Sequence, residues 1–290
     1  MHPDPDLPPI GSAWPYGNSA YHRLRNKFDY LFGRILMRSI NKEIHRFRGK
    51  HDLRRHDILN GNASRLATIA QIARQFDFPW RHSPNWFHYV GAMHNSGSRQ
   101  EIGFPFERLD GRPLIYASMG TAQNRLYSIF RAIAEACVDI PAQLVISMGG
   151  GGTPSELGEL AGNPIVVAYA PQLDLIRRAS LVITHAGMNT AAESIAQGVP
   201  MVAIPVTNDQ PAVAARIAWT GCGVAIPFSK ASADLVARAV KQVLADNQYA
   251  ARARELAEAN QLAGGAAKTA DVIEQLFCKR RSSDRLPLIK

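Results

Sequence analysis

The chain has 290 residues and a mass of 31.8 kDa, enough for one large domain or two ordinary ones. Its apolar content of 46% and charged content of 20% are typical of a soluble globular protein. The sequence has no apolar run of about 18 residues, and its first residues, MHPDPDLPPIGSAWPYG, do not resemble a signal peptide. Cys137, Cys222 and Cys278 lack CxxC spacing, so we expect reduced thiols in a cytoplasmic protein.

Most of the net charge of +9 lies in one segment near the N-terminus. Residues 21–56 carry eleven Lys or Arg against three acids. Within this segment, residues 21–48 place apolar side chains at helical spacing with basic residues between them, which predicts a basic amphipathic helix. The helix could be a solvated or partner-covered face, or it could lie on an anionic membrane. We expect no nucleic-acid partner, because no aromatic-interleaved or helix-turn-helix pattern accompanies the charge.

Residues 1–93 predict an incomplete, largely helical N-terminal part. A second helix is predicted over 63–75, and a short strand over 87–91. Residues 94–112 are polar and contain several glycines and a proline, a composition that suits an interdomain linker.

Strands and helices alternate regularly from Leu114 onward, which predicts an α/β domain over 113–290 with a parallel sheet and helices on both faces. The predicted strands are 114–118, 143–148, 165–169, 181–184, 200–204 and 223–227. The predicted helices are 123–138, 172–179, 189–197, 210–219, 231–245, 248–260 and 266–277.

Polar groups follow two of these strands directly. His185-Ala186-Gly187 ends the first apolar run, and Asp209-Gln210 follows the second. Open α/β sheets bind ligands at the carboxyl ends of their strands, so we expect a site here. The glycine run 149–152 lacks the Lys-Ser/Thr of a P-loop and is either a loop near this crevice or merely a turn.

A phosphate group suits the start of the helix after His185. A helix that opens with Asn189-Thr190 presents free backbone N–H groups and a positive dipole end, although the pair could serve only as a cap. Gly187 permits close approach to the backbone, and His185 can donate to the same anion. A strand-end histidine satisfied by backbone is the alternative for His185.

Hydroxyl groups suit the acidic and amide side chains nearby. Glu193 can accept from a vicinal diol such as a ribose, or simply complement the helix dipole. Asp209 and Gln210 can bind further hydroxyls, or cap the next helix. Diphosphate, ribose and sugar hydroxyls together predict a nucleotide-sugar.

The pattern His-x-Gly-x-Asn-Ser/Thr-x-x-Glu, followed sixteen positions on by Asp-Gln, resembles the donor-binding signature of GT-B glycosyltransferases that use UDP-sugars. The matching positions are His185, Gly187, Asn189, Thr190, Glu193, Asp209 and Gln210. The sequences at 87–92, 112–125 and 208–217 are similar to those of bacterial enzymes related to zeaxanthin glucosyltransferase. The match covers residues from about 76 to 277.

Two further segments resemble parts of this family. Tyr169-Ala170-Pro171-Gln172 is similar to its aromatic-x-Pro-Gln segment, which implies that Tyr169 stacks on uracil and that Gln172 contacts the base or ribose. Plant members usually carry Trp at the first position, and Tyr169 could instead be a core aromatic. The loop from Ser118 to Thr121 resembles a second phosphate-contacting loop, although both residues could be helix caps.

The resemblance implies a GT-B architecture in which 113–290 is the donor-binding domain and the last helix, 266–277, crosses back to the N-terminal part. It implies inverting transfer of a hexose, with glucose expected, from a UDP-sugar to an acceptor hydroxyl. No metal or other cofactor is expected, because the donor part has no Asp-x-Asp motif. The bacterial branch implies a lipophilic, carotenoid-like acceptor, and residues 21–48 then suggest a peripheral position on the inner face of the membrane.

The family's general base, a His near the start of the acceptor half, has no match in this chain. The histidines His22, His45, His51, His56, His82, His88 and His94 lie in basic or linker contexts. We therefore expect the C-terminal two-thirds of such an enzyme, weakly active alone. The alternative is a non-catalytic UDP-sugar-binding subunit that needs a separate acceptor-domain chain, and an epimerase activity is less favoured.

Overall fold

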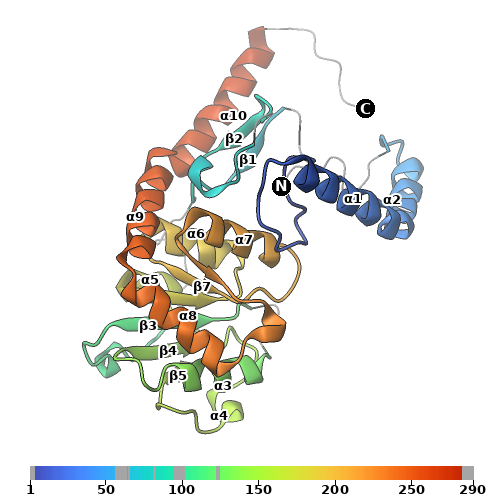
Figure 1. The fold of residues 1–290 in the computed structure, drawn as a ribbon. Helices are drawn as coiled ribbons and strands as arrows, with labels where there is room; N and C mark the ends of the chain where they lie inside the picture. The colour runs from blue at the N-terminus through green and yellow to red at the C-terminus, as the bar shows by residue number, and fades with distance from the viewer. Residues whose placement is uncertain are drawn as a thin grey trace.

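The structure, a computed structural model, describes residues 4–55, 64, 66–80, 83–93, 102–121 and 125–282, with side chains as far as Phe277. A six-stranded parallel sheet with the order β5-β4-β3-β6-β7-β8 forms its centre (Figure 1). The strands are β3 (Leu114–Ser118), β4 (Gln143–Ser147), β5 (Ile165–Val167), β6 (Ala179–Thr184), β7 (Met201–Ala203) and β8 (Gly223–Ala225). The α/β prediction is confirmed.

Helices cover both faces of this sheet because strand side chains alternate between two apolar cores. Ile115 and Ala117 face the core of α3 (Tyr127–Ala136) and α8 (Ala233–Ala245). Leu114 and Tyr116 face the opposite core. That second core is formed by α5 (Gln172–Arg178), α6 (Met188–Ala196), α7 (Gln210–Thr220) and α9 (Asn247–Leu262). The short α4 (Pro154–Leu157) was not expected from the sequence.

The strand order changes direction at β3, so the topological switch point of the sheet lies between β3 and β6. The chain runs from β3 through β4 to β5 on one side and returns to β6 on the other. Ser118 at the end of β3 is in register with Thr184 at the end of β6. A crevice therefore opens between the two carboxyl ends, which is where open α/β sheets place ligands.

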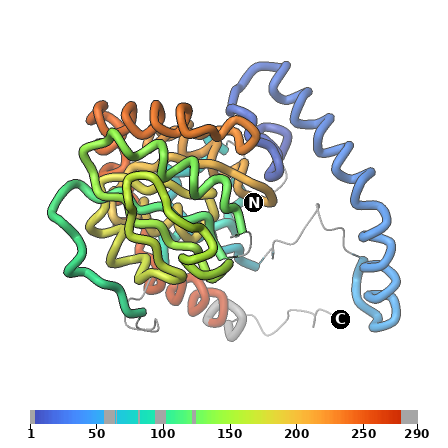
Figure 2. Tube along the Cα trace, turned by 90° about the horizontal axis from the view of Figure 1, so that it is seen from below, coloured from blue at the N-terminus to red at the C-terminus, as the bar shows by residue number. Residues whose placement is uncertain are grey.

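The basic N-terminal segment forms an arm that projects from the body of the molecule (Figure 2). The single helix predicted over 21–48 is wrong in detail, because two helices occupy it, α1 (Ala20–Leu36) and α2 (Arg38–Lys50). Met37 separates them with φ −84° and ψ 4°, and its N–H donates to the Gly33 carbonyl. Glycine is a weak helix former, so Gly33, one turn before Met37, is consistent with the break between the two helices.

The helix predicted over 63–75 is also wrong, as far as its described residues go. The structure has β1 (Thr68–Ala70) and a 3₁₀ turn, η1 (Arg74–Phe76), in its place. β1 pairs in parallel with β2 (Phe87–Tyr89), so tertiary pairing of β-branched Thr68 and Ile69 overrides the local helical spacing.

A buried ion pair ties the segment that holds β1 and β2 to the sheet domain. Arg216 of α7, 1% exposed, lies 2.8 Å from the Asp77 carboxylate, and its guanidinium stacks over Phe78 at 4.3 Å from the ring centre. Asp77 also accepts from the Tyr89 hydroxyl at 2.7 Å. Trp80 donates to Asp4 at 2.8 Å, so the irregular start of the chain is held to the same region.

The last helix, α10 (Gly265–Ser282), runs back along the N-terminal segment (Figure 1). The Gly265 N–H donates to the Val90 carbonyl at 2.6 Å, and the Asn260 side chain accepts from the Ala92 N–H at 2.8 Å. The division into 1–93, 94–112 and 113–290 remains a prediction, and residues 94–101 lie outside the described part. Within the described residues, no helix is long and apolar enough to cross a membrane.

Candidate functional site

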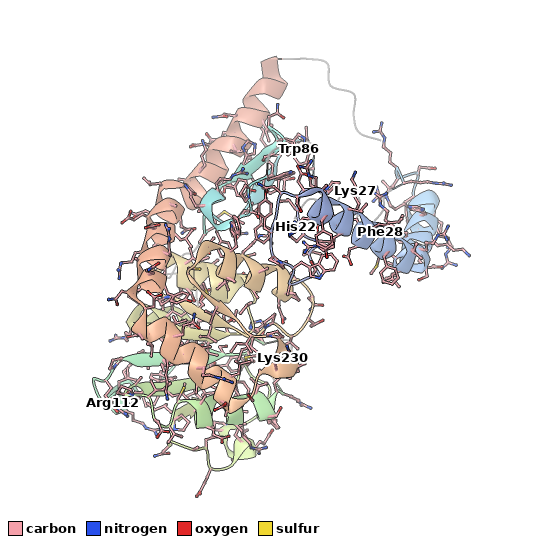
Figure 3. The ribbon with its side chains drawn as sticks, in the orientation of Figure 1. His22, Lys27, Phe28, Trp86, Arg112 and Lys230 are labelled. Carbon is pink, nitrogen blue, oxygen red and sulfur yellow. The ribbon has the colours of Figure 1, made fainter. Side chains whose placement is uncertain are left out.

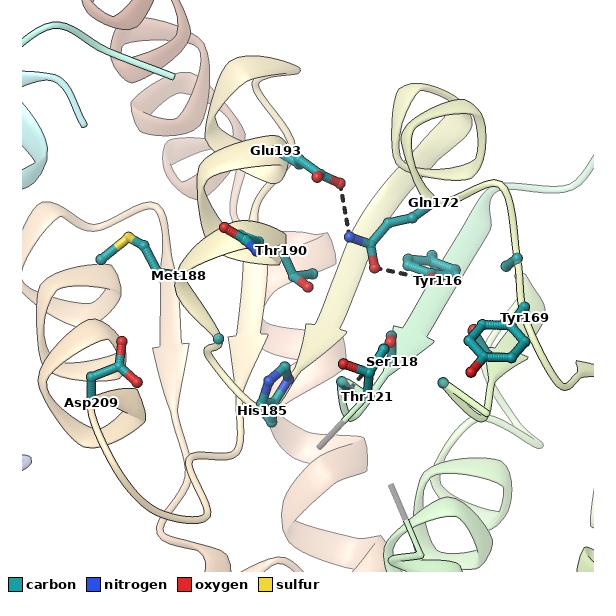
Figure 4. A pocket seen from close by; sticks show the side chains of 16 residues that line it. Tyr116, Ser118, Thr121, Tyr169, Gln172, His185, Met188, Thr190, Glu193 and Asp209 are labelled. Carbon is teal, nitrogen blue, oxygen red and sulfur yellow. Dashed lines mark hydrogen bonds between the residues drawn. The ribbon is translucent and has the colours of Figure 1, made fainter. Parts of the chain in front are cut away.

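A cavity of about 490 Å³ opens at the switch point between β3 and β6 (Figure 4). All the predicted donor-site residues except Gln210 line it. They are Ser118, Thr121, Tyr169, Gln172, His185, Gly187, Asn189, Thr190, Glu193 and Asp209. The sequence prediction therefore assembled one site from segments that are distant along the chain.

The His185 imidazole sits between two glycines. A Cβ added at Gly120 would lie 2.5 Å from His185 Nε2, and one added at Gly187 would lie 2.3 Å from the same atom. Gly120 also has a φ of +80°, which favours glycine. Both positions therefore need glycine for the ring to occupy its seat.

The loop between β6 and α6 is strained at Ala186, a buried non-glycine residue with φ +61°. Its N–H donates to the Thr184 hydroxyl at 3.1 Å, which stabilises the left-handed turn. Strain of this kind, on the order of 1–3 kcal/mol, is concentrated at functional sites. The turn directs His185 and the start of α6 toward the same cavity.

The N-terminus of α6 carries no side-chain cap. Its N-cap residue is Gly187, which makes no side-chain hydrogen bond, and Asn189 and Thr190 lie within the first turn. The alternative that Asn189-Thr190 caps the helix is thus not observed. The first backbone N–H groups of a helix have no partner within the helix, so this end suits an anion.

The surroundings of His185 act on its pKa in opposite directions, and burial is the largest influence. Burial lowers its pKa below the ordinary 6.5, although the Ser118 backbone and the Asp209 carboxylate favour the charged form. Its buried Nδ1 has no hydrogen-bond partner within the described part of the chain. A bound anion would favour the protonated ring and so raise this pKa.

A row of hydrogen bonds crosses the floor of the cavity. The Gln172 amide donates to Glu193 at 2.8 Å and accepts from the Tyr116 hydroxyl at 3.2 Å (Figure 4). Glu193 is only 1% exposed, so its carboxylate is positioned by these contacts. Ser147 lies beside Tyr116 in the same lining.

Tyr169 and the glycine loop form one rim of the cavity. The Tyr169 side chain is 54% exposed, which excludes the alternative that it is a core aromatic. A Cβ at Gly150 would lie 1.9 Å from the Tyr169 hydroxyl, and one at Gly149 would lie 2.0 Å from the Gly120 carbonyl oxygen. The run 149–152 is therefore a close-packed loop at the crevice and more than a turn.

Asp209 and Gln210 separate in the structure. Asp209 is the N-cap residue of α7 but makes no side-chain capping bond, and it lines the cavity. Gln210 is buried, and its side-chain oxygen accepts from the backbone N–H groups of Val206 and Thr207 at 2.8 and 3.0 Å. Gln210 thus shapes the loop that carries Asp209, and it is absent from the cavity lining.

The sequence reasoning missed Tyr116 and Ser147 as lining residues. Tyr116 precedes Ser118 by two positions, so alternation along β3 places both on one face of the strand, a signal that was present. Ser147 ends the neighbouring strand and is in register with Ser118. Within the described residues there is no group of three His, Cys, Asp or Glu that could hold a metal ion.

Comparison with known proteins identifies the family of this chain. The family model described as "UDP-glucoronosyl and UDP-glucosyl transferase" matches residues 15–261. Zeaxanthin glucosyltransferase of Pantoea ananas is 33% identical over 281 residues, which cover 96% of this chain and 65% of the relative. The enzyme of that name from Pseudescherichia vulneris is 35% identical over 221 residues, which cover 76% and 52%.

The crystal structure of CalG4, the calicheamicin glycosyltransferase, has a TM-score of 0.63 and 25% identity, covering 73% of this chain and 54% of that chain. The present chain thus spans between about half and two-thirds of the length of these relatives. Its six-stranded parallel sheet with helices agrees with the GT-B glycosyltransferase fold. With the family model matching most of its length, the chain belongs to the UDP-glucoronosyl and UDP-glucosyl transferase family.

Proposed function

We propose that the cavity binds the nucleotide of a UDP-sugar and that the chain supplies the donor side of a hexosyl transfer. The observation that carries this proposal is the convergence of His185, the uncapped start of α6 and the hydroxyl groups of Ser118 and Thr121 on one cavity. These groups are donors around a space large enough for a diphosphate. They suit the negative charge that develops on UDP as it leaves.

The remaining lining residues fit the other parts of such a ligand. The exposed Tyr169 ring at the rim suits stacking on the base. The fixed Glu193 carboxylate suits the ribose diol, and Asp209 suits hydroxyls of the sugar. Gln172 donates to Glu193, so its part in recognition is to orient that carboxylate.

The reaction proposed is inverting transfer to an acceptor hydroxyl. A general base removes the acceptor proton, the hydroxyl oxygen attacks the anomeric carbon, and the bond to UDP breaks on the opposite face. Glucose is the proposed sugar and a lipophilic, carotenoid-like molecule the proposed acceptor, because two relatives are zeaxanthin glucosyltransferases.

Calorimetric titration of UDP, UDP-glucose and TDP-glucose tests the donor site. We expect micromolar to millimolar affinity for UDP, because a few charge-assisted hydrogen bonds are offset by the ordering costs of binding. His185→Ala and Glu193→Ala should weaken UDP binding by roughly tenfold or more, since each charged hydrogen bond contributes about 1.5–3 kcal/mol. His51→Ala, on the exposed arm, is the matched control. An unmeasurable affinity of the native chain for all three ligands would overturn the proposal.

A second candidate is a donor-binding subunit that requires a separate acceptor-domain chain. It is favoured by the described lining of the cavity, which contains one histidine, His185, and that residue is already proposed to contact the diphosphate. Loss of a general base costs about 10²–10⁴ in rate. A transfer assay with UDP-glucose separates the candidates. Full turnover by the purified chain supports an enzyme complete in itself, whereas binding without turnover supports the subunit.

We also propose that the arm lies on an anionic membrane surface. Its apolar side chains are exposed, and Lys27 and Phe28 both lie on α1, away from the sheet (Figure 3). The exposed apolar residues of the arm are Tyr21, Leu24, Phe28, Leu31, Phe32, Ile35, Leu36, Ile40 and Phe47. Apolar burial and basic charge together favour a lipid interface, where each nearby Lys or Arg contributes about 1 kcal/mol.

Sedimentation with vesicles of neutral and anionic lipid tests this surface. Changing Arg34, Arg38, Lys42 and Arg46 to Glu should lower binding to anionic vesicles by at least about a hundredfold. The matched control makes the same charge change on the exposed residues Lys230, Arg238, Lys241 and Arg252. Unchanged sedimentation of the arm variant would reject the membrane and favour a partner-covered face.

A further inference from the structure

Tyr116 carries a buried hydroxyl in the lining of the cavity. The proposed function gives this hydroxyl no role. The Tyr116 side chain is 1% exposed, and its hydroxyl lies 3.2 Å from the Gln172 side-chain oxygen. Ser118 and Ser147 also hydrogen-bond to it, and burial, the dominant influence, raises the pKa of the phenol to about 12. A phenol held neutral in this way keeps its proton at every pH near neutrality.

The direction of each hydrogen bond in this row is fixed by chemistry. A carboxylate only accepts, so the Gln172 amide must present its NH₂ group to Glu193, at 2.8 Å. The Gln172 oxygen then faces Tyr116, whose single proton must point to it. The phenol oxygen is left to accept from Ser118 or Ser147, in agreement with the pKa-lowering effect of both hydroxyls. The Ser118 hydroxyl carries a single proton, so when it donates to a bound diphosphate Ser147 remains the donor to the phenol.

We propose that Tyr116 is a positioning residue that holds the Gln172 amide in one orientation and thereby fixes the Glu193 carboxylate for a ribose diol. The chain would in this way prefer ribonucleoside diphosphates to 2′-deoxyribonucleoside diphosphates. This inference rests on the proposed function, because it concerns the same site. Tyr116 itself need not touch the ligand.

Preorganisation explains why the effect depends on the sugar of the nucleotide. With the Tyr116 proton removed, the Gln172 amide can turn, and its bond to Glu193 is no longer maintained. A carboxylate that must be ordered during binding loses part of the gain from each hydroxyl it accepts. A ligand without the 2′-hydroxyl has less to lose, so the same change affects it less.

Titrations of UDP and 2′-deoxy-UDP on the full chain test this role. The native chain should bind 2′-deoxy-UDP about three- to tenfold more weakly than UDP, the range expected for one net hydrogen bond. Tyr116→Phe keeps the ring, so it should weaken UDP binding about three- to tenfold and bring the ratio of the two dissociation constants below about two. Tyr249→Phe, which loses a phenol that bonds to Gln242 outside the cavity, should leave the ratio unchanged.

A double-mutant cycle separates positioning from packing. In a Gln172→Ala background, Tyr116→Phe should change the UDP dissociation constant less than twofold, because the partner it orients is gone. If Tyr116→Phe does not give a cooperative thermal transition, Ser147→Ala takes its place, since it removes a donor to the same phenol. It should lower the ratio by a smaller factor.

The outcomes distinguish the two levels of the proposal. A native chain that binds neither nucleotide overturns the proposed function. A native chain that binds UDP, with a ratio unaltered by Tyr116→Phe or by its Ser147→Ala substitute, overturns the role of Tyr116 alone. Equal effects of Tyr116→Phe with and without Gln172 also overturn it.

Discussion

Gly187→Ala should weaken nucleotide binding without straining the backbone. Gly187 has φ −63° and ψ 135°, angles that alanine adopts readily. The added Cβ, however, would lie 2.3 Å from Nε2 and 2.6 Å from Cε1 of His185, below the 3.0 Å that real Cβ contacts respect. The imidazole must therefore leave its seat between the two glycines.

The loss follows from the contact that His185 makes with the diphosphate under the proposed function. A charge-assisted hydrogen bond contributes roughly 1.5–3 kcal/mol, so the UDP dissociation constant should rise roughly 10- to 150-fold. Calorimetric titration measures this change. Gly103→Ala is the matched control, because a Cβ there meets nothing within 4 Å.

A second background shows whether the ring is the cause. With His185→Ala already present, adding Gly187→Ala should change the dissociation constant less than about twofold, since the atoms that clash are absent. If the full loss persists in that background, the Cβ obstructs the ligand itself and the reasoning is refuted. Native affinity in the single variant would refute it as well.

Three further outcomes can be measured. Burial lowers the pKa of His185 in the folded chain, so below about pH 6.5 the unfolded chain binds more protons than the folded chain. The free energy of unfolding should therefore fall as the pH drops below about 6.5. In urea titrations, His185→Gln should make that fall smaller. Arg216→Met leaves the buried Asp77 carboxylate unpaired and should lower the free energy of unfolding by roughly 3–5 kcal/mol, whereas Arg177→Met, at an exposed ion pair, should change it by less than about 1 kcal/mol. EDTA should leave the UDP dissociation constant within about twofold, and a constant that follows added Mg²⁺ would contradict a metal-free site.

The sheet domain could be predicted from the sequence because its strands are buried on both faces. Such strands are short, nearly continuous apolar runs, and every predicted strand from 114–118 to 223–227 has a counterpart in the sheet. The helices between them show a clear apolar face. The strand order and the switch point were not predicted, since periodicity alone does not order strands; the structure gives them.

The failures have physical causes outside local sequence. Residues 63–75 were predicted as a helix from the local sequence alone. That sequence carries no information about the partner strand at 87–89, whose pairing makes residues 68–70 a strand. The candidate site was largely predicted, since loop residues at strand ends carry chemical side chains. Tyr116 was missed because it lies inside a strand among apolar residues. Gln210 was predicted in the site because the Asp-Gln pair resembles the family signature, but its side chain accepts from the backbone N–H groups of Val206 and Thr207. Contact of these residues with a nucleotide stays a prediction.

The Arg216–Asp77 ion pair restricts how the molecule can move. The pair joins α7, whose N-cap residue is Asp209, to the segment that holds β1 and β2. Separating two buried charges costs several kcal/mol, so any rotation of the segment that breaks this contact is disfavoured. Any motion of this segment relative to the sheet must pivot elsewhere. The segment that holds β1 and β2 would then keep a constant angle to the cavity between β3 and β6.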